Sequence, residues 1–422
     1  FKCDWSSDVC SSDLSLADEQ GDTQAQFALV QLYAATGRRG DADKVLAGLK
    51  ARRETSLDAT LIMARLAYAD KETARAYALV KEVLDSSPKE SKALLLKSQI
   101  DLNEKRFADA ISSAKAALAA EPNLPDAHIV QGEALRQQRD LDGAKAAFNE
   151  ALRMRPADPA IQIALSQLNL ATGGVETARQ LAQSALTTAP QAPVARVAVV
   201  RAAIAANDLT RADTELASLA KQYPTVPQVL ALQGTLSLAK KNWAAAERFY
   251  KQAEGATPGS LEIATGLTYI ELNTNRAAAA RARVEKLVAG DPKNVDFLLL
   301  AARTYASLKD IDKSEETLRD AVDADPGRTE PYALLASLYV QQSKLDRALQ
   351  EFQTLSTKQP KSVGVKTMIA AIYQTQNKRS EAQKAYREAL ALDSSAAVAN
   401  RLPKVVVCAA TLWLRPVSAV SE

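Results

Sequence analysis

The chain has 422 residues, of which 53 are Lys or Arg and 50 are Asp or Glu, so its formal net charge at pH 7 is +3. This near balance argues against strong attraction to nucleic acid or to an anionic membrane, and the single His and three Cys exclude a two-His metal site and a disulfide scaffold. With only 15 Gly, about half the usual ~7%, the composition favours helix.

The first 14 residues, FKCDWSSDVCSSDL, lack helical periodicity and lack the basic and apolar segments of a signal peptide. Their sequence is similar to a translated sequencing adapter. We therefore expect residues 1–14 to be non-native, the alternative being a disordered native leader. Residues 15–22 are expected to lead into the first regular element.

From residue 23 onward the sequence repeats every 34 residues. The interval is marked by nine prolines in register: Pro88, Pro122, Pro156, Pro190, Pro224, Pro258, Pro292, Pro326 and Pro360. It divides residues 23–396 into eleven units, which begin at residues 23, 57, 91, 125, 159, 193, 227, 261, 295, 329 and 363. Numbering each unit from 1 to 34 places the prolines at position 32. Such a fixed period is typical of repeat proteins.

Each unit contains two stretches with helical periodicity. Residues no larger than Val recur at positions 8 and 20, and larger apolar residues are frequent at positions 11, 17 and 24. Because positions 4, 8 and 11 share one helix face, as do 17, 20, 24 and 27, the spacing predicts two amphipathic helices. A turn is expected near positions 14–16, where Thr36, Gly37 and Asn207 stand. The proline should end the second helix.

This pattern resembles the tetratricopeptide repeat family over residues 23–396. The resemblance implies an all-α fold, a right-handed superhelical α-solenoid of eleven helix–turn–helix repeats, with the first helices lining a concave groove. Long arrays without insertions are similar to those of bacterial envelope assembly and polysaccharide export. Similar arrays also occur in the cytoplasm, so the compartment stays open between the periplasm or cell envelope and the cytoplasm.

Residues 397–422 break the pattern and are expected to be a partial twelfth repeat or an aberrant tail. Their apolar stretch, Val405–Leu414, is too short to span a bilayer. It could form a capping helix or a strand, or it could result from a shifted reading frame, which is the interpretation we favour.

We predict no catalytic residue, no metal site and no cofactor, and hence no enzyme. His128 falls at a packing position with no inferred nucleophile beside it, and Cys3 and Cys10 lack a second pair of ligands. Gly173 and Gly174 fall at a helix turn and not in a phosphate-binding loop. Adjacent basic residues are scattered over helix ends, so we expect no nucleic-acid track and no small-molecule substrate.

What remains is the inner surface of the first helices. Position 9 supplies the residues that we predict to bind a partner in the concave groove: Gln31, Arg65, Gln99, Glu133, Gln167, Arg201, Tyr269 and Arg303. Positions 5 and 12 are mostly apolar, and an apolar strip beside a polar one suits an amphipathic helix or an extended peptide. The alternative is that these apolar residues pack against neighbouring units.

The sequence therefore predicts a non-catalytic scaffold for protein–protein interaction, with a protein or peptide as its partner. Position 5 has no Lys and position 9 has no Asn, so the carboxylate clamp that the resemblance implies for co-chaperone arrays is absent. Position 6 lacks the Asn ladder of sugar-transferase arrays. The alternative function is the regulatory or substrate-binding arm of a larger enzyme.

Overall fold

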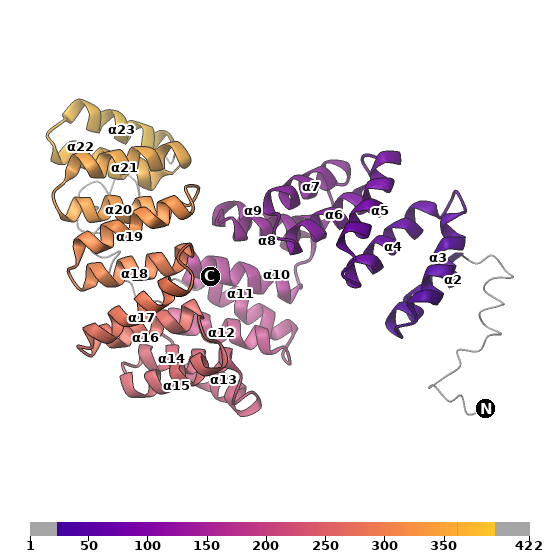
Figure 1. Ribbon diagram of the computed structural model, residues 1–422, viewed down its shortest axis with the longest axis horizontal. Coiled ribbons are helices and arrows are strands. Elements are labelled where there is room, and N and C mark those ends of the chain that lie inside the picture. The colour runs from indigo at the N-terminus through magenta and orange to yellow at the C-terminus, as the bar shows by residue number, and fades with distance from the viewer. Residues whose placement is uncertain (1–22, 361, 393–422) are drawn as a thin grey trace. The chain divides into compact units, whose positions relative to one another are not determined.

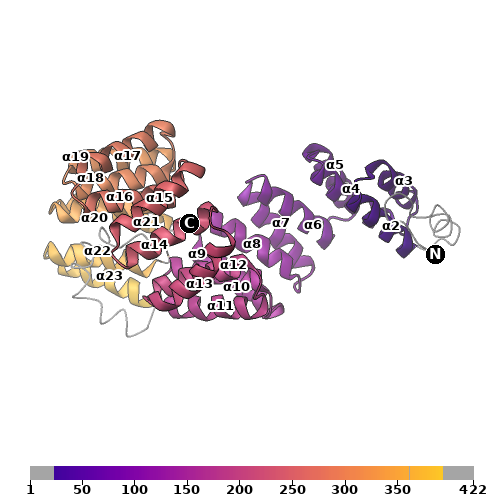
Figure 2. The same cartoon turned by 90° about the horizontal axis from the view of Figure 1, so that it is seen from below.

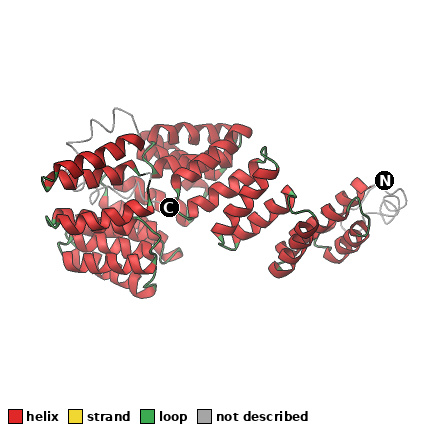
Figure 3. Cartoon of the chain, turned by 90° about the horizontal axis from the view of Figure 1, so that it is seen from above, coloured by secondary structure: helices red, strands yellow, loops and turns green. Residues whose placement is uncertain are grey.

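In the computed structural model of the protein, residues 23–360 and 362–392 are described; the expected leader (1–14), lead-in (15–22) and tail (397–422) lie outside them. The described residues form 22 helices and no strand (Figures 1 and 3). Their bounds are α2 Thr23–Ala35, α3 Arg39–Lys50, α4 Ser56–Ala69, α5 Thr73–Ser86, α6 Ser91–Asn103, α7 Phe107–Ala120, α8 Pro125–Gln137, α9 Leu141–Met154, α10 Pro159–Ala171, α11 Val175–Thr188, α12 Pro193–Ala205, α13 Leu209–Gln222, α14 Pro227–Ala239, α15 Trp243–Ala256, α16 Leu261–Asn273, α17 Ala277–Gly290, α18 Val295–Ser307, α19 Ile311–Ala324, α20 Glu330–Gln341, α21 Leu345–Lys358, α22 Val363–Thr375 and α23 Arg379–Leu392.

The helices alternate between two roles. Even-numbered helices are the first helices of successive helix–turn–helix pairs, and odd-numbered helices are the second (Figure 2). From α2 to α9 and from α12 to α23, each helix contacts the next one along the chain. The predicted all-α solenoid is thus confirmed. The division of the chain into eleven repeats remains our interpretation of this alternation.

The chain forms two compact units, which we describe separately. The N-terminal unit holds α2–α9 and most of α10, and the C-terminal unit holds most of α11 and all of α12–α23. In the middle of each unit, first helices also contact the first helix of the next pair: α4 contacts α6 and α6 contacts α8 in one unit, and α12, α14, α16 and α18 contact one another in succession in the other. In α4–α8 and α12–α18 the first helices therefore stand closer together than the second helices, which places them on the inner side of the stack there.

The core consists of apolar clusters between consecutive pairs, not of one central core. The small residues at positions 8 and 20 are buried in every described pair, as Val200 and Ala212 illustrate. In the pair α8 and α9, a Cβ added at Gly132 would lie 2.8 Å from the ring of Phe148. The expectation that small residues permit close approach of the two helices is confirmed.

The turn inside each pair has the same backbone conformation throughout. Position 15 has a positive φ in all eleven pairs, between 58° and 85°. Glycine occupies it only at Gly37 and Gly173; the other nine residues are Lys71, Lys105, Arg139, Asn207, Lys241, Asn275, Lys309, Ser343 and Asn377. The left-handed residue reverses the chain between the two helices, and the cost of that conformation for a lysine is met by the packing on either side.

The residue after this turn is the N-cap of the second helix, which begins one residue later. At Asp140, Asp208, Asn242 and Asp310 the side chain accepts a hydrogen bond from the backbone N–H three residues on, which caps the helix. The second helix from α5 to α21 ends two residues before the proline of its unit, as α13 does at Gln222 before Pro224. Proline thus ends the second helix as predicted.

Candidate functional site

The first-helix surface of the C-terminal unit contains a cavity of about 600 Å³, which we call the α14 cavity. It lies mainly between α12, α14 and α16. Its lining consists of Leu170, Arg201, Ile204, Ala205, Asn207, Leu232, Thr235, Leu238, Ala239, Lys241, Trp243, Tyr250, Glu262, Tyr269 and Asn273. Most of these belong to positions 9, 12 and 15 of consecutive units, so the repeat itself brings them to one place.

Two glycines create the room for one wall of the α14 cavity. Tyr250, on α15, is only 2% exposed and inserts its ring between α14 and α16. A Cβ added at Gly234 would lie 2.9 Å from the ring, and one added at Gly266 would lie 2.5 Å from Cζ. The hydroxyl of Tyr250 lies 2.9 Å from Oγ1 of Thr235, and burial raises the pKa of the phenol. The wall is therefore aromatic, uncharged and held by one hydrogen bond.

Two further contacts border the cavity. The rings of Trp243 and Tyr269 lie 6.0 Å apart at an interplanar angle of 43°, within the range of attractive aromatic pairs. Nη2 of Arg201 lies 3.2 Å from Oε2 of Glu262, and both side chains are about a quarter exposed. This ion pair joins α12 to α16 and so passes over α14, the helix between them.

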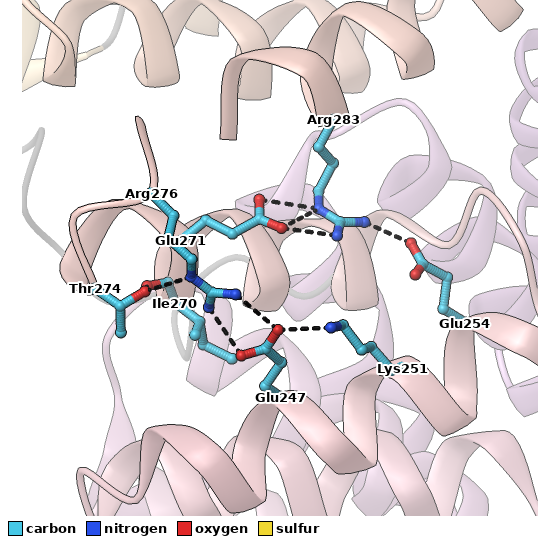
Figure 4. A network of polar contacts seen from close by, with 8 residues as sticks. All are labelled: Glu247, Lys251, Glu254, Ile270, Glu271, Thr274, Arg276 and Arg283. Carbon is cyan, nitrogen blue, oxygen red and sulfur yellow. Dashed lines mark hydrogen bonds and ion pairs between the residues drawn. The ribbon is translucent and has the colours of Figure 1, made fainter. Parts of the chain in front are cut away.

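A polar network fixes α16 against the second helices (Figure 4). Arg283 of α17 donates to Glu271 of α16 at 2.9 Å and to Glu254 of α15 at 2.6 Å. Beside it, hydrogen bonds from Arg276 and Lys251 lower the pKa of Glu247 to about 2. Because these contacts join α15, α16 and α17, they hold in place the helix that carries Glu262 and Tyr269.

The N-terminal unit has a smaller cavity of about 300 Å³ on its own first-helix surface. Its lining consists of Arg65, Tyr68, Leu96, Gln99, Ile100, Leu102 and Asn103, from α4 and α6. It lacks a tryptophan, and its only aromatic residue, Tyr68, donates a hydrogen bond to Glu104 at 3.3 Å. Both cavities thus use positions 9 and 12 of successive first helices.

The eight residues predicted to bind a partner have different surroundings. Arg65 and Gln99 line the cavity of the N-terminal unit, and Arg201 and Tyr269 line the α14 cavity. Gln31 and Gln167 are exposed on α2 and α10. The structure therefore brings four of the predicted residues to two cavities, and the role of all eight stays a prediction.

Glu133 and Arg303, the remaining two, contrast in their pairing. Burial opposes the charge of Glu133, but hydrogen bonds from Arg136 at 2.7 Å and from Gln137 at 2.8 Å outweigh it, so its pKa is lowered. Arg303, on α18, is half-buried, and its side chain makes no hydrogen bond or ion pair with a described residue, although the charges of Glu330 and Asp296 favour its own. Burial lowers its pKa.

The apolar positions of the first helices separate into two groups. At position 5, Leu61, Leu95 and Leu299 are buried against neighbouring helices. At position 12, Tyr68 and Leu238 are half-buried and line the two cavities. The alternative of simple packing therefore holds for many residues at position 5, while position 12 supplies the apolar surface of the cavities.

Several lining residues escaped the sequence analysis, among them Trp243, Tyr250 and Glu262. Trp243 and Tyr250 lie on a second helix, whose apolar residues we had assigned to packing alone. Glu262 stands at position 2, which is seven residues before Tyr269 on the same helix. The sequence did contain an indication of the place of Tyr250, because the two helices that flank it in the chain each have a glycine, Gly234 and Gly266, that leaves room for a large ring.

The described residues contain no group of three or more His, Cys, Asp or Glu that could hold a metal ion. None of the helices in residues 23–392 is long and apolar enough to cross a bilayer. His128 is half-buried, burial lowers its pKa, and its Nδ1 has no hydrogen-bond partner.

Comparison with protein families supports the interpretation of the repeat. Three models described as a tetratricopeptide repeat match the chain: one at residues 169–236 and 272–338, one at 95–149 and 129–193, and one at 363–395. Together they cover more than half of the chain. No curated protein matches it significantly.

Among solved structures, yeast Tom70 is 13% identical and matches 94% of this chain and 96% of its own, with a TM-score of 0.50. A tetratricopeptide repeat protein from Parabacteroides merdae is 17% identical over 56% of this chain and 93% of its own, with a TM-score of 0.45. PilW, described as a widely conserved type IV pilus biogenesis factor, is 21% identical over 50% and 98%, with a TM-score of 0.45. The likeness to Tom70 shows a shared fold.

Proposed function

Because the chain belongs to the tetratricopeptide repeat family, whose repeats generally serve as modules for protein–protein interaction, we propose that it is a non-catalytic interaction scaffold. Its partner presents a peptide or an amphipathic helix to the first-helix surface of the C-terminal unit. The observation that carries the proposal is the α14 cavity, which receives an apolar side chain of that partner.

The size and lining of the α14 cavity support such an anchor. Its volume of about 600 Å³ falls in the range of ligand sites, ~300–1,000 Å³. Ile204, Leu232 and Leu238 provide apolar contact, and full burial of a Leu- or Phe-sized side chain contributes about 1.5–3 kcal/mol. Asn207 and Lys241 offer polar groups at the same cavity for the partner's backbone or acidic side chains. An apolar centre with polar groups around it is typical of a protein interface.

We further propose, from the sequence resemblance alone, that the partner belongs to an envelope or polysaccharide-export assembly of bacteria. Peptides selected from a displayed random 12-residue library on the full chain provide a probe that does not depend on this assignment. Fractionation of cells that produce the chain, followed by cross-linking, tests the assignment itself. A partner confined to cytoplasmic machinery would contradict it.

The cavity is tested by filling it. Ala205 lines the α14 cavity, whereas its neighbour Ala206 is exposed and outside the lining, so Ala205→Trp and Ala206→Trp form a matched pair. We expect Ala205→Trp to weaken binding of the selected peptides at least tenfold and Ala206→Trp to leave it within twofold. Equal affinity for both variants, with unchanged helicity, would exclude the cavity as the anchor site.

A further inference from the structure

The hydroxyl of Tyr250 lies at the end of its ring that borders the α14 cavity. The side chain starts on α15 and passes between Gly234 of α14 and Gly266 of α16, which leave room for its ring. Both Tyr250 and Thr235 line the cavity, and Oη of Tyr250 lies 2.9 Å from Oγ1 of Thr235. A nearly buried hydroxyl thus forms part of the cavity wall.

The hydrogen bonds of Thr235 decide which of the two hydroxyls donates. Oγ1 of Thr235 lies 3.0 Å from the backbone carbonyl oxygen of Ala231, one turn earlier in α14, and a carbonyl oxygen can only accept. Because the single hydroxyl proton of Thr235 is used there, its oxygen accepts the proton of Tyr250. Among the described residues, no second group hydrogen-bonds to Oη of Tyr250. This oxygen therefore presents an acceptor to the cavity and has no further proton to give.

The charges of Arg201 and Glu262 lie near this hydroxyl and oppose each other. Burial is the largest cause that raises the pKa of Tyr250; Glu262 raises this pKa further and Arg201 lowers it. The phenol therefore stays protonated at neutral pH. Since Arg201 and Glu262 are paired at 3.2 Å, this end of the cavity favours neither a cationic nor an anionic occupant.

The remaining lining suits the ring of an aromatic side chain. The rings of Trp243 and Tyr269 lie 6.0 Å apart, and a third ring beside them gains the contacts of offset or edge-to-face pairs. Ile204 and Leu238 add aliphatic contact. The volume of about 600 Å³ falls in the range of sites for drug-sized ligands, so the cavity has room for an indole as well as for a phenol.

We infer that the partner's anchor in the α14 cavity is a tryptophan or tyrosine side chain, whose N–H or O–H donates to Oη of Tyr250. Water satisfies such an acceptor when no ligand is bound, and an occupant displaces that water. An occupant without a donor leaves the buried acceptor unpaired, so a leucine or phenylalanine side chain binds less well despite its similar apolar contacts. This inference rests on the proposed function, because it describes the side chain that occupies the same cavity.

The first test compares pairs of peptides on the full, unaltered chain. It uses those selected 12-residue peptides that Ala205→Trp weakens, and the anchor is the residue whose replacement by alanine costs most affinity. We expect this residue to be tryptophan or tyrosine. Replacing tyrosine by phenylalanine, or tryptophan by benzothienylalanine, in which sulfur takes the place of the N–H, should weaken binding about fivefold or more. Anchors that are aliphatic or phenylalanine, or pairs that bind equally, would refute the inference while leaving the proposed function intact.

The second test removes the acceptor from the chain. In Tyr250→Phe, which keeps the ring and loses the hydroxyl, the two members of each pair should bind within twofold of each other. Tyr269→Phe is the matched control, because it removes a hydroxyl from the same cavity and should preserve the difference within each pair. A difference that persists in Tyr250→Phe, or that is lost in Tyr269→Phe, would overturn the inference, because the donor would then meet another acceptor.

Circular dichroism establishes that both variants keep their helicity. If Tyr250→Phe loses it, the comparison on the unaltered chain still decides between an anchor with a donor and one without. If no selected peptide is weakened by Ala205→Trp, the proposed function fails and the inference falls with it.

Discussion

Replacing Gly266 by alanine is the sharpest test of how the α14 cavity is built. The new Cβ would lie 2.5 Å from Cζ and 2.6 Å from Cε2 of Tyr250, whereas carbon atoms in contact are ordinarily about 3.5–4.0 Å apart. The ring would have to move by about 1 Å. A Cβ at Gly234 would also be close to the ring, so the ring can move only towards the α14 cavity that it lines.

Three contributions determine how much Gly266→Ala changes the free energy of unfolding. Overpacking costs about 1–3 kcal/mol, and loss of the hydrogen bond between Tyr250 and Thr235 costs about 1 kcal/mol more. The gain in helix propensity from Gly to Ala, about 1 kcal/mol, offsets the second contribution. We therefore expect Gly266→Ala to lower the free energy of unfolding by about 1–3 kcal/mol.

The measurement is hydrogen exchange of peptides from α14 to α16, combined with urea unfolding followed by circular dichroism, because local exchange reports the stability of the affected pairs. Gly255→Ala in α15 is the control, since its new Cβ would meet no atom within 4 Å and should stabilise the chain by about 0.5–1 kcal/mol. If Gly266→Ala proves as stable as Gly255→Ala, Tyr250 is not confined between the two glycines and our account of the cavity wall is wrong.

Three further predictions concern the helix pairs. Ala212 is completely buried at position 20, so Ala212→Leu should overpack α12 against α13 and lower the free energy of unfolding by about 1–3 kcal/mol, measured by urea unfolding; an unchanged curve would contradict the close approach. Lys309 has a φ of 62°, and this left-handed conformation is less favourable for lysine than for glycine. Lys309→Gly should therefore raise the free energy of unfolding by about 0.5–1 kcal/mol, measured as an increase in the unfolding temperature. A decrease would show that the contacts of the lysine side chain stabilise the fold by more than the backbone conformation costs. The lowered pKa of Glu247 means that its ion pairs stabilise the fold fully above its ordinary pKa of 4.5 and are lost as pH falls towards about 2, so Glu247→Gln should flatten the fall in stability across that window; identical pH profiles would refute the pairing.

The repeat made most of the fold predictable from the sequence. The proline interval and the small residues at positions 8 and 20 indicate where helices end and where they approach, because both effects are local and recur in every unit. The positive φ at Lys71 and Lys105 was not predictable from those residues, since lysine has no preference for it. The only indication in the sequence is that Lys71 and Lys105 stand at the same repeat position as Gly37 and Gly173.

The candidate site was less predictable than the fold. A pattern at position 9 does not distinguish one unit from another, whereas the structure distinguishes Arg201, which forms an ion pair, from Arg303, whose side chain forms none with a described residue. That pairing depends on how closely first helices two units apart approach, and a periodic pattern does not contain this information. The place of Tyr250 in the cavity was also not predictable from the repeat pattern, since its ring reaches the cavity through space left by Gly234 and Gly266.

Among the described residues, the main contacts between helices join elements that are one or two steps apart in the chain, and the ion pair between Arg201 of α12 and Glu262 of α16 reaches farther. The number of repeats can therefore change without loss of the fold. Excision or duplication of 34 consecutive residues joins helices at the same repeat positions, so the new neighbours can pack as the old ones did. Gain or loss of a unit alters the number of sites along the stack without redesigning any interface. The α14 cavity is the exception, because it needs α12, α14 and α16 in succession, and an excision among them would erase it.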